Sequence, residues 1–140
     1  MRNKATLTLM ELSIMLAVFA LAAALCMRGF VWAAETADTC GARDQALVEV
    51  QNAAEVLKSC RGDLEGAAER FGGSQDAGVW TVRYNEQWEQ VLQGGVYTLR
   101  VERTESKVDL LGTAEIRMLS AQTCLIELET AWQEESPDGA

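Results

Sequence analysis

The chain has a long apolar segment near its N-terminus, with one carboxylate at the start of it. All 16 residues at positions 12–27 are uncharged, and Glu11 stands directly before them. The apolar stretch continues past Arg28 to Ala34, which makes it long enough to span a bilayer as a helix. Arg28 can extend its side chain toward water. Because a carboxylate in such a helix costs a few kcal/mol unless it is paired, Glu11 is a candidate functional residue.

No residue nearby in the chain is a good partner for Glu11. Lys4 lies outside the uncharged run, and Arg28 is 17 positions beyond Glu11. That separation corresponds to roughly 25 Å along a helix at 1.5 Å per residue. We therefore expect Glu11 to be neutralised by another molecule.

Residues 7–18 read LTLMELSIMLAV, after a short basic leader that contains Arg2 and Lys4. This order resembles the N-terminus of type IV pilins and type II secretion pseudopilins. In that family a leader is followed by an apolar or aromatic residue, then Thr, Leu, an apolar residue and Glu. The resemblance places the first mature residue at Leu7 and the family's glutamate at Glu11.

The resemblance implies a processing and assembly pathway. A prepilin peptidase would cut between Thr6 and Leu7 and methylate the new amine of Leu7, although the family has Gly, sometimes Ala, where Thr6 stands. The carboxylate of Glu11 would then neutralise the amine of a neighbouring subunit. The implied partners are other pilin-like subunits, the peptidase, a membrane assembly platform and the lipid bilayer. The chain would be a structural, and by its outline a minor, subunit of such a filament.

Three interpretations of the apolar segment are open. In the first it is a signal peptide, with candidate small-residue cleavage sites around positions 20–24, which leaves Glu11 in its core unexplained. In the second it is a plain anchor for an extracellular binding domain that does not polymerise. In the third it is a pilin-like helix, and only this interpretation gives Glu11 a role. Lipoprotein cleavage is excluded, because Leu25 precedes Cys26 where a small residue is needed.

Composition narrows the function of the remaining 106 residues. They carry 9 basic and 20 acidic residues, a net charge of −11, which argues against binding to a nucleic-acid backbone. The chain has no His, the commonest general base and metal ligand. No Cys-x-x-Cys pattern and no phosphate-binding loop occurs. We therefore expect no catalytic site, no metal and no cofactor.

Residue periodicity predicts an α+β domain over residues 35–133. The helix should continue beyond the apolar segment, because small and apolar residues recur at three- and four-residue spacing. Asp63 is expected to cap a short helix over 64–71 that ends at Gly72. The helical stripe consists of Ala46, Val50, Ala53, Leu57 and Cys60.

After Gly78 the period changes to two, which predicts four strands over 79–84, 97–102, 108–118 and 124–132. Short connections favour an antiparallel meander, with Gly112 a possible bulge. The fold class is therefore a long N-terminal helix, half transmembrane and half amphipathic, packed on a four-stranded antiparallel sheet. Residues 1–6 form the leader, 7–34 the membrane or filament-core helix and 134–140 a disordered tail.

The cysteines suggest one disulfide. Cys40 and Cys60 would lie roughly 30 Å apart on a continuous helix, beyond bonding reach. Cys60 with Cys124 is the more plausible pair, joining the helix to the sheet, and the alternative is that both are small buried hydrophobes. An oxidising exterior would favour the bond.

The basic leader and acidic domain place the N-terminus in the cytoplasm and the domain outside, in a single-pass topology.

We predict that processing, where it occurs, cuts between Thr6 and Leu7, and that Thr6→Gly increases the processed fraction because it restores the residue typical of the family. Intact-mass analysis of the protein extracted from membranes measures both. An N-terminus created after Ala22 or Ala24 would instead identify an ordinary signal peptide.

Overall fold

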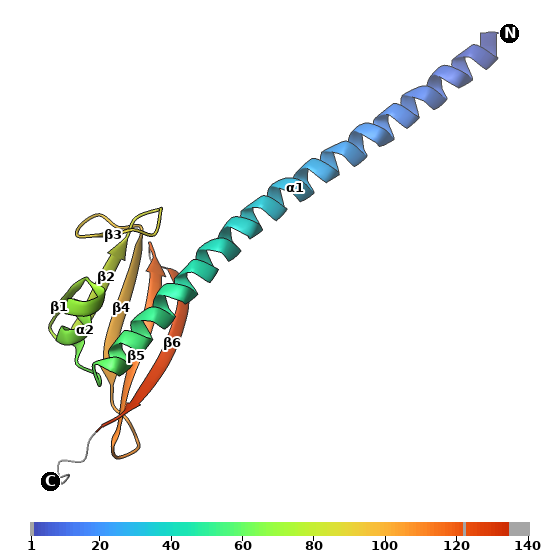
Figure 1. Ribbon diagram of the computed structural model, residues 1–140. Coiled ribbons are helices and arrows are strands. Elements are labelled where there is room, and N and C mark those ends of the chain that lie inside the picture. The colour runs from blue at the N-terminus through green and yellow to red at the C-terminus, as the bar shows by residue number, and fades with distance from the viewer. Residues whose placement is uncertain (1, 122, 135–140) are drawn as a thin grey trace, which may run out of the picture. The chain divides into compact units, whose positions relative to one another are not determined.

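The computed structural model describes residues 2–121 and 123–134. It is an α+β protein with one long helix, α1 (Arg2–Ser59), followed by a short helix and an open antiparallel sheet. The chain divides into two units, Met1–Gly41 and Ala42–Ala140. Gly41 lies within α1 and does not interrupt it. The first unit is helix alone, and the second contains the last part of α1 and all the other elements (Figure 1).

The sheet has six strands where the sequence predicts four. Its order is β1-β2-β4-β5-β6. The short strand β3 also pairs with β2, on the same edge of β2 as β1. The sequence did not predict β1 and β3. These strands have three and two residues, which is too few for a two-residue period to be detected. The other four strands form the predicted antiparallel meander. The bounds are β1 (Ser74–Asp76), β2 (Val79–Tyr84), β3 (Gln90–Val91), β4 (Tyr97–Thr104), β5 (Leu111–Ser120) and β6 (Thr123–Gln133).

The turn between the two helices has the predicted capping residues. Asp63 accepts a hydrogen bond from the backbone N–H of Glu65 and begins α2 (Leu64–Phe71). Gly72 follows at φ 108°, a conformation that glycine adopts without steric cost. The N–H of Gly72 donates to the carbonyl of Ala68, which closes the last turn of the helix.

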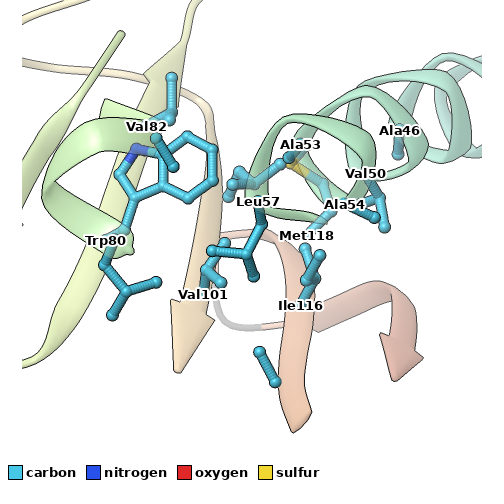
Figure 2. Close-up of a cluster of buried hydrophobic side chains, with 14 of the residues drawn as sticks. Ala46, Val50, Ala53, Ala54, Leu57, Trp80, Val82, Val101, Ile116 and Met118 are labelled. Carbon is cyan, nitrogen blue, oxygen red and sulfur yellow. The ribbon is translucent and has the colours of Figure 1, made fainter. Parts of the chain in front are cut away.

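One face of the sheet packs against the predicted stripe of α1. Figure 2 shows this stripe facing Trp80, Val101 and Ile116 from the strands. Small side chains at every third or fourth position let the helix backbone lie close to the sheet. Four members of the stripe, Ala46, Val50, Ala53 and Leu57, are 0% exposed, and the fifth, Cys60, is half-buried.

A polar contact also joins α1 to the sheet. The hydroxyl of Tyr84 on β2 donates to Glu49 Oε2 at 3.1 Å. Burial raises the pKa of the Tyr84 phenol well above its usual value, and the negative charge of Glu49 raises it further. The phenol therefore stays protonated and keeps its donor role over the whole physiological range.

The strand over 108–118 is displaced from its predicted position. β5 begins at Leu111, while Val108 and Leu110 lie in the preceding loop with 61% and 49% of their surface exposed. Gly112 is not a bulge. The register shift falls between Met118 and Leu119 instead.

Gly112 is needed for a different reason, because it lies against the indole ring of Trp132. A Cβ at Gly112 would meet the ring at 2.4 Å, and one at Gly62 on the turn after α1 would meet it at 2.1 Å. The guanidinium of Arg103 lies 5.4 Å from the ring centroid and pairs with Glu134. This cluster closes the end of the core at which β6 finishes.

The residue that opens the predicted disordered tail is held to the domain. The N–H of Glu134 donates to the carbonyl of Leu110 at 2.9 Å. The remaining positions of that predicted tail, 135–140, lie outside the described residues.

We predict that Gly112→Ala lowers the free energy of unfolding by roughly 1–3 kcal/mol, because the new methyl group overpacks the Trp132 ring. Denaturant unfolding of the full chain in detergent, followed by tryptophan fluorescence, measures the change. Gly41→Ala is the matched control, since a Cβ there meets no atom within 4 Å. Equal midpoints for Gly112→Ala and the unaltered chain would show that this packing does not contribute.

Candidate functional site

The first unit has an apolar surface that nothing in the described structure covers. Every side chain from position 3 to position 41 is exposed. Large apolar residues such as Phe19 and Phe30 expose 75% and 78% of their surface. Apolar patches of this extent mark a surface that contacts lipid or another protein.

The local sequence explains why this segment is a helix without tertiary support. Ala, Leu and Met dominate it, all strong helix formers, and it contains no proline. Its hydroxyl groups are satisfied within the helix. Thr8 donates to the carbonyl of Lys4 and Ser13 to that of Leu9, each at 2.8 Å. The backbone and these side chains can therefore enter an apolar environment with their hydrogen bonds made.

Glu11 lies in a shallow groove on this helix, among the side chains of Leu7, Met10, Ile14 and Met15. The structure thus places two predicted site residues, Leu7 and Glu11, one helical turn apart on the same side. No ion pair to Glu11 occurs among the residues described. That Glu11 pairs with another molecule stays a prediction.

The predicted cleavage point lies within the same helix. The peptide bond from Thr6 to Leu7 is part of α1, and Leu7 is 65% exposed.

The predicted disulfide is not formed, since Cys60 and Cys124 are both free. Cys60 precedes Gly62, which contacts Trp132 near the end of β6, whereas Cys124 lies at the start of that strand. Eight residues of strand separate Cys124 from Trp132, roughly 26 Å at 3.3 Å per residue. Cys60, close to the Trp132 end of β6, therefore lies far from Cys124 at the other end, beyond the reach of a disulfide.

The bulge also explains why Cys124 is not the buried hydrophobe of the alternative interpretation. Met118 pairs with Ile126, but Leu119 pairs with Cys124, so Leu125 is an extra residue in β6. The alternation therefore changes phase at this point. Leu125 packs against the core and Cys124 is exposed.

Among its described residues, the second unit offers no other site of comparable strength. Trp88, the one aromatic residue in the polar loop before β3, stacks on Tyr97 with ring centroids 4.1 Å apart and so packs on the domain itself. On the outer face of the sheet Arg117 pairs with both Glu115 and Glu127. Across positions 2–121 and 123–134, no three acidic or cysteine side chains gather to hold a metal ion.

Within the described chain, a single helix, Asn3–Ser59, has the length and apolar composition needed to cross a membrane. Signal sequences near the N-terminus meet the same criterion. Core helices of soluble proteins meet it too, but they are mostly buried, whereas the apolar window here is 0% buried. The exposed part of the helix is therefore compatible with lipid.

Comparisons of the chain with protein-family models, with curated proteins and with solved structures gave no match.

We predict that lipid protects Cys26 but not Cys40 or Cys124. All three thiols are exposed in the structure, so selective protection of Cys26 requires that lipid covers its part of the helix. A membrane-impermeant maleimide applied to intact, wall-stripped cells, followed by peptide mass analysis, measures the labelling. Cys26 should react only after the membrane is dissolved in SDS. Equal labelling of the three cysteines in intact membranes would contradict a membrane span.

Proposed function

We propose that the chain is a structural subunit of a type IV pilus-like or type II secretion-like filament and assembles through its N-terminal helix. The observation that carries the proposal is Glu11, a carboxylate in an exposed apolar groove with no ion pair in the described chain. A single anchor in lipid gains nothing from this residue and has to accommodate its charge. A bundle of such helices gives it a cationic partner.

The difference between the two parts of α1 also supports a filament subunit. The last part of α1 is buried in the core of the outer domain, while the first part presents an uncovered apolar surface. A helix of this kind can hold the monomer in a bilayer and later exchange lipid for the helices of other copies. In this proposal the N-terminus is cytoplasmic and the acidic domain lies outside, because Arg2 and Lys4 precede the apolar segment.

Processing would complete the assembly surface. A prepilin peptidase would release residues 1–6 and methylate the amine of Leu7, and a membrane assembly platform would extract the subunit. The amine of one copy and the Glu11 carboxylate of another would then meet among apolar helices, where their attraction is strong because the local dielectric is low.

The test is Glu11→Ala. Removing one member of a buried ion pair leaves the other unpaired, at a cost of roughly 3–5 kcal/mol. We therefore expect Glu11→Ala to stay in the membrane but to enter sheared surface filaments or cross-linked oligomers at a level more than about 100-fold lower. Quantitative immunoblotting of membrane and filament fractions measures both.

Glu55→Ala is the matched control, because it removes the same charge from an exposed position of α1 outside the apolar segment. It should assemble normally. Assembly of Glu11→Ala at the unaltered level would contradict the proposed role and favour the alternative, a membrane-anchored binding domain that does not polymerise.

A further inference from the structure

Four of the charged residues of the exposed helix follow a repeated spacing, whereas Arg2 and Asp38 fall outside it. Between positions 3 and 35 there are four of them, Lys4, Glu11, Arg28 and Glu35. Each basic residue is followed by an acidic residue seven positions later. The two pairs share this order, and 16 uncharged residues separate Glu11 from Arg28, so the spacing is the only regularity that relates them.

Seven residues place two side chains on the same side of a helix but too far apart to touch. The rotation falls about 20° short of two full turns, and the axial separation is roughly 10.5 Å. Contacts within one helix occur at spacings of three and four residues. In agreement, none of these four side chains makes an ion pair among the residues that the structure describes.

Both acidic residues lie against apolar side chains, and neither makes an ion pair among the residues that the structure describes. Glu11 shares its groove with Leu7 and Met10. A second groove near the end of the apolar segment is lined by Arg28, Glu35 and apolar neighbours that include Trp32. If a second copy packs parallel to the first and is shifted by seven residues, its Lys4 lies level with Glu11 and its Arg28 lies level with Glu35.

We propose that this shift of seven residues is the register in which copies of the chain associate before the leader is cleaved, with Glu11 paired to Lys4 and Glu35 paired to Arg28 of the next copy. The inference rests on the proposed assembly through the N-terminal helix, and it adds the partner residues and the axial step. It also gives Glu11 a cation while the leader is still attached, so the first contacts between copies precede cleavage.

Electrostatic repulsion argues against the unshifted arrangement. Two parallel helices in register would place each of the four charged residues level with the same residue of the other copy, so that like charges would repel. The shifted pair leaves one unpaired set of charges at each end, which can accept a further copy. Such head-to-tail contacts build open assemblies and not closed dimers.

An antiparallel pair would also match the charges, because Lys4 would then lie level with Glu35 and Glu11 with Arg28. Copies that insert into a membrane under the same positive-inside bias have the same orientation, which favours the parallel arrangement. The two arrangements differ in which residue faces Arg28, and a charge-reversal experiment separates them.

The geometry of the two pairs fits a packed bundle. Lys4 and Arg28 are about 120° apart around a straight helix of 3.6 residues per turn. In a left-handed supercoil, with 3.5 residues per turn, the angle falls to about 50°. The long side chains of Lys4 and Arg28 can bridge that difference toward one neighbouring helix.

The first experiment reverses charges in the full chain and measures cross-linked oligomers in membranes with an amine-independent photo-cross-linker. Arg28→Glu should reduce oligomers at least about tenfold, because it opposes Glu35 of the next copy. Adding Glu35→Arg to Arg28→Glu should restore them to the unaltered level. Lys58→Glu, at an exposed position outside the apolar segment, is the control and should have no effect.

The second experiment measures the register directly by oxidative thiol cross-linking in a Cys60→Ser, Cys124→Ser background, which leaves thiols only at 26 and 40. Ala33 lies seven residues after Cys26 and seven before Cys40. Ala33→Cys should therefore give a ladder of disulfide-linked oligomers. The background protein, whose thiols at 26 and 40 are fourteen positions apart, should give none. Ala34→Cys, rotated by about 100° around the helix, is the matched control and should give no ladder.

The outcomes separate this register from the proposed function. Disulfide dimers in the background protein through Cys26 and its own copy would show an unshifted pair and overturn the register, while self-association would stand. Rescue of Arg28→Glu by Glu11→Arg in place of Glu35→Arg would show an antiparallel pair and also overturn it. A monomer in every measurement would overturn the register together with the proposed assembly.

Discussion

The packing of the small-residue stripe of α1 against the sheet is the interaction on which the structure depends. An antiparallel sheet with one apolar face has to cover that face, and here the cover is the last part of the same helix that forms the exposed first unit. Ala46 and Ala53 bring the helix backbone close to the strands, while Val50 and Leu57 fill the space between them. One continuous helix therefore serves two environments, the interior of a domain and an uncovered apolar surface.

The division of α1 follows from the distribution of polar residues around it. In the second unit the exposed Glu55 lies on a side of the helix that the sheet does not cover, and the half-buried Glu49 lies at the border, where it reaches Tyr84. In the first unit no such division exists, because apolar residues occur on all sides. A helix that is apolar all round is stable only inside lipid or among other helices. In the proposed assembly, the few charges that this helix carries are the features that distinguish one arrangement of copies from another.

The candidate site was visible in the sequence to an unusual degree, because it belongs to one helix. Leu7 and Glu11 lie one turn apart in any α-helix, so their common groove needs no tertiary information. Glu35 was missed when the sequence was examined for isolated charges, and the signal that identifies it is its spacing from Arg28, equal to that of Lys4 and Glu11. The predicted disulfide between Cys60 and Cys124 is not formed in the structure. Whether these two residues meet depends on distances across the whole domain, which local sequence patterns do not contain.

The sequence by itself determined the fold class, both helices and the four long strands, because three- to four-residue and two-residue periodicities are local properties of the chain. Only the tertiary structure decided the register of β5 and β6, where a bulge at Leu125, opposite Met118 and Leu119, leaves Cys124 exposed. It also added β1 and β3, which are too short to show a period and form because β2 offers them a partner. Gly112 is a glycine because Trp132, twenty residues later, packs its ring there. Such contacts depend on which segments meet in space, and local periodicity carries no information about them.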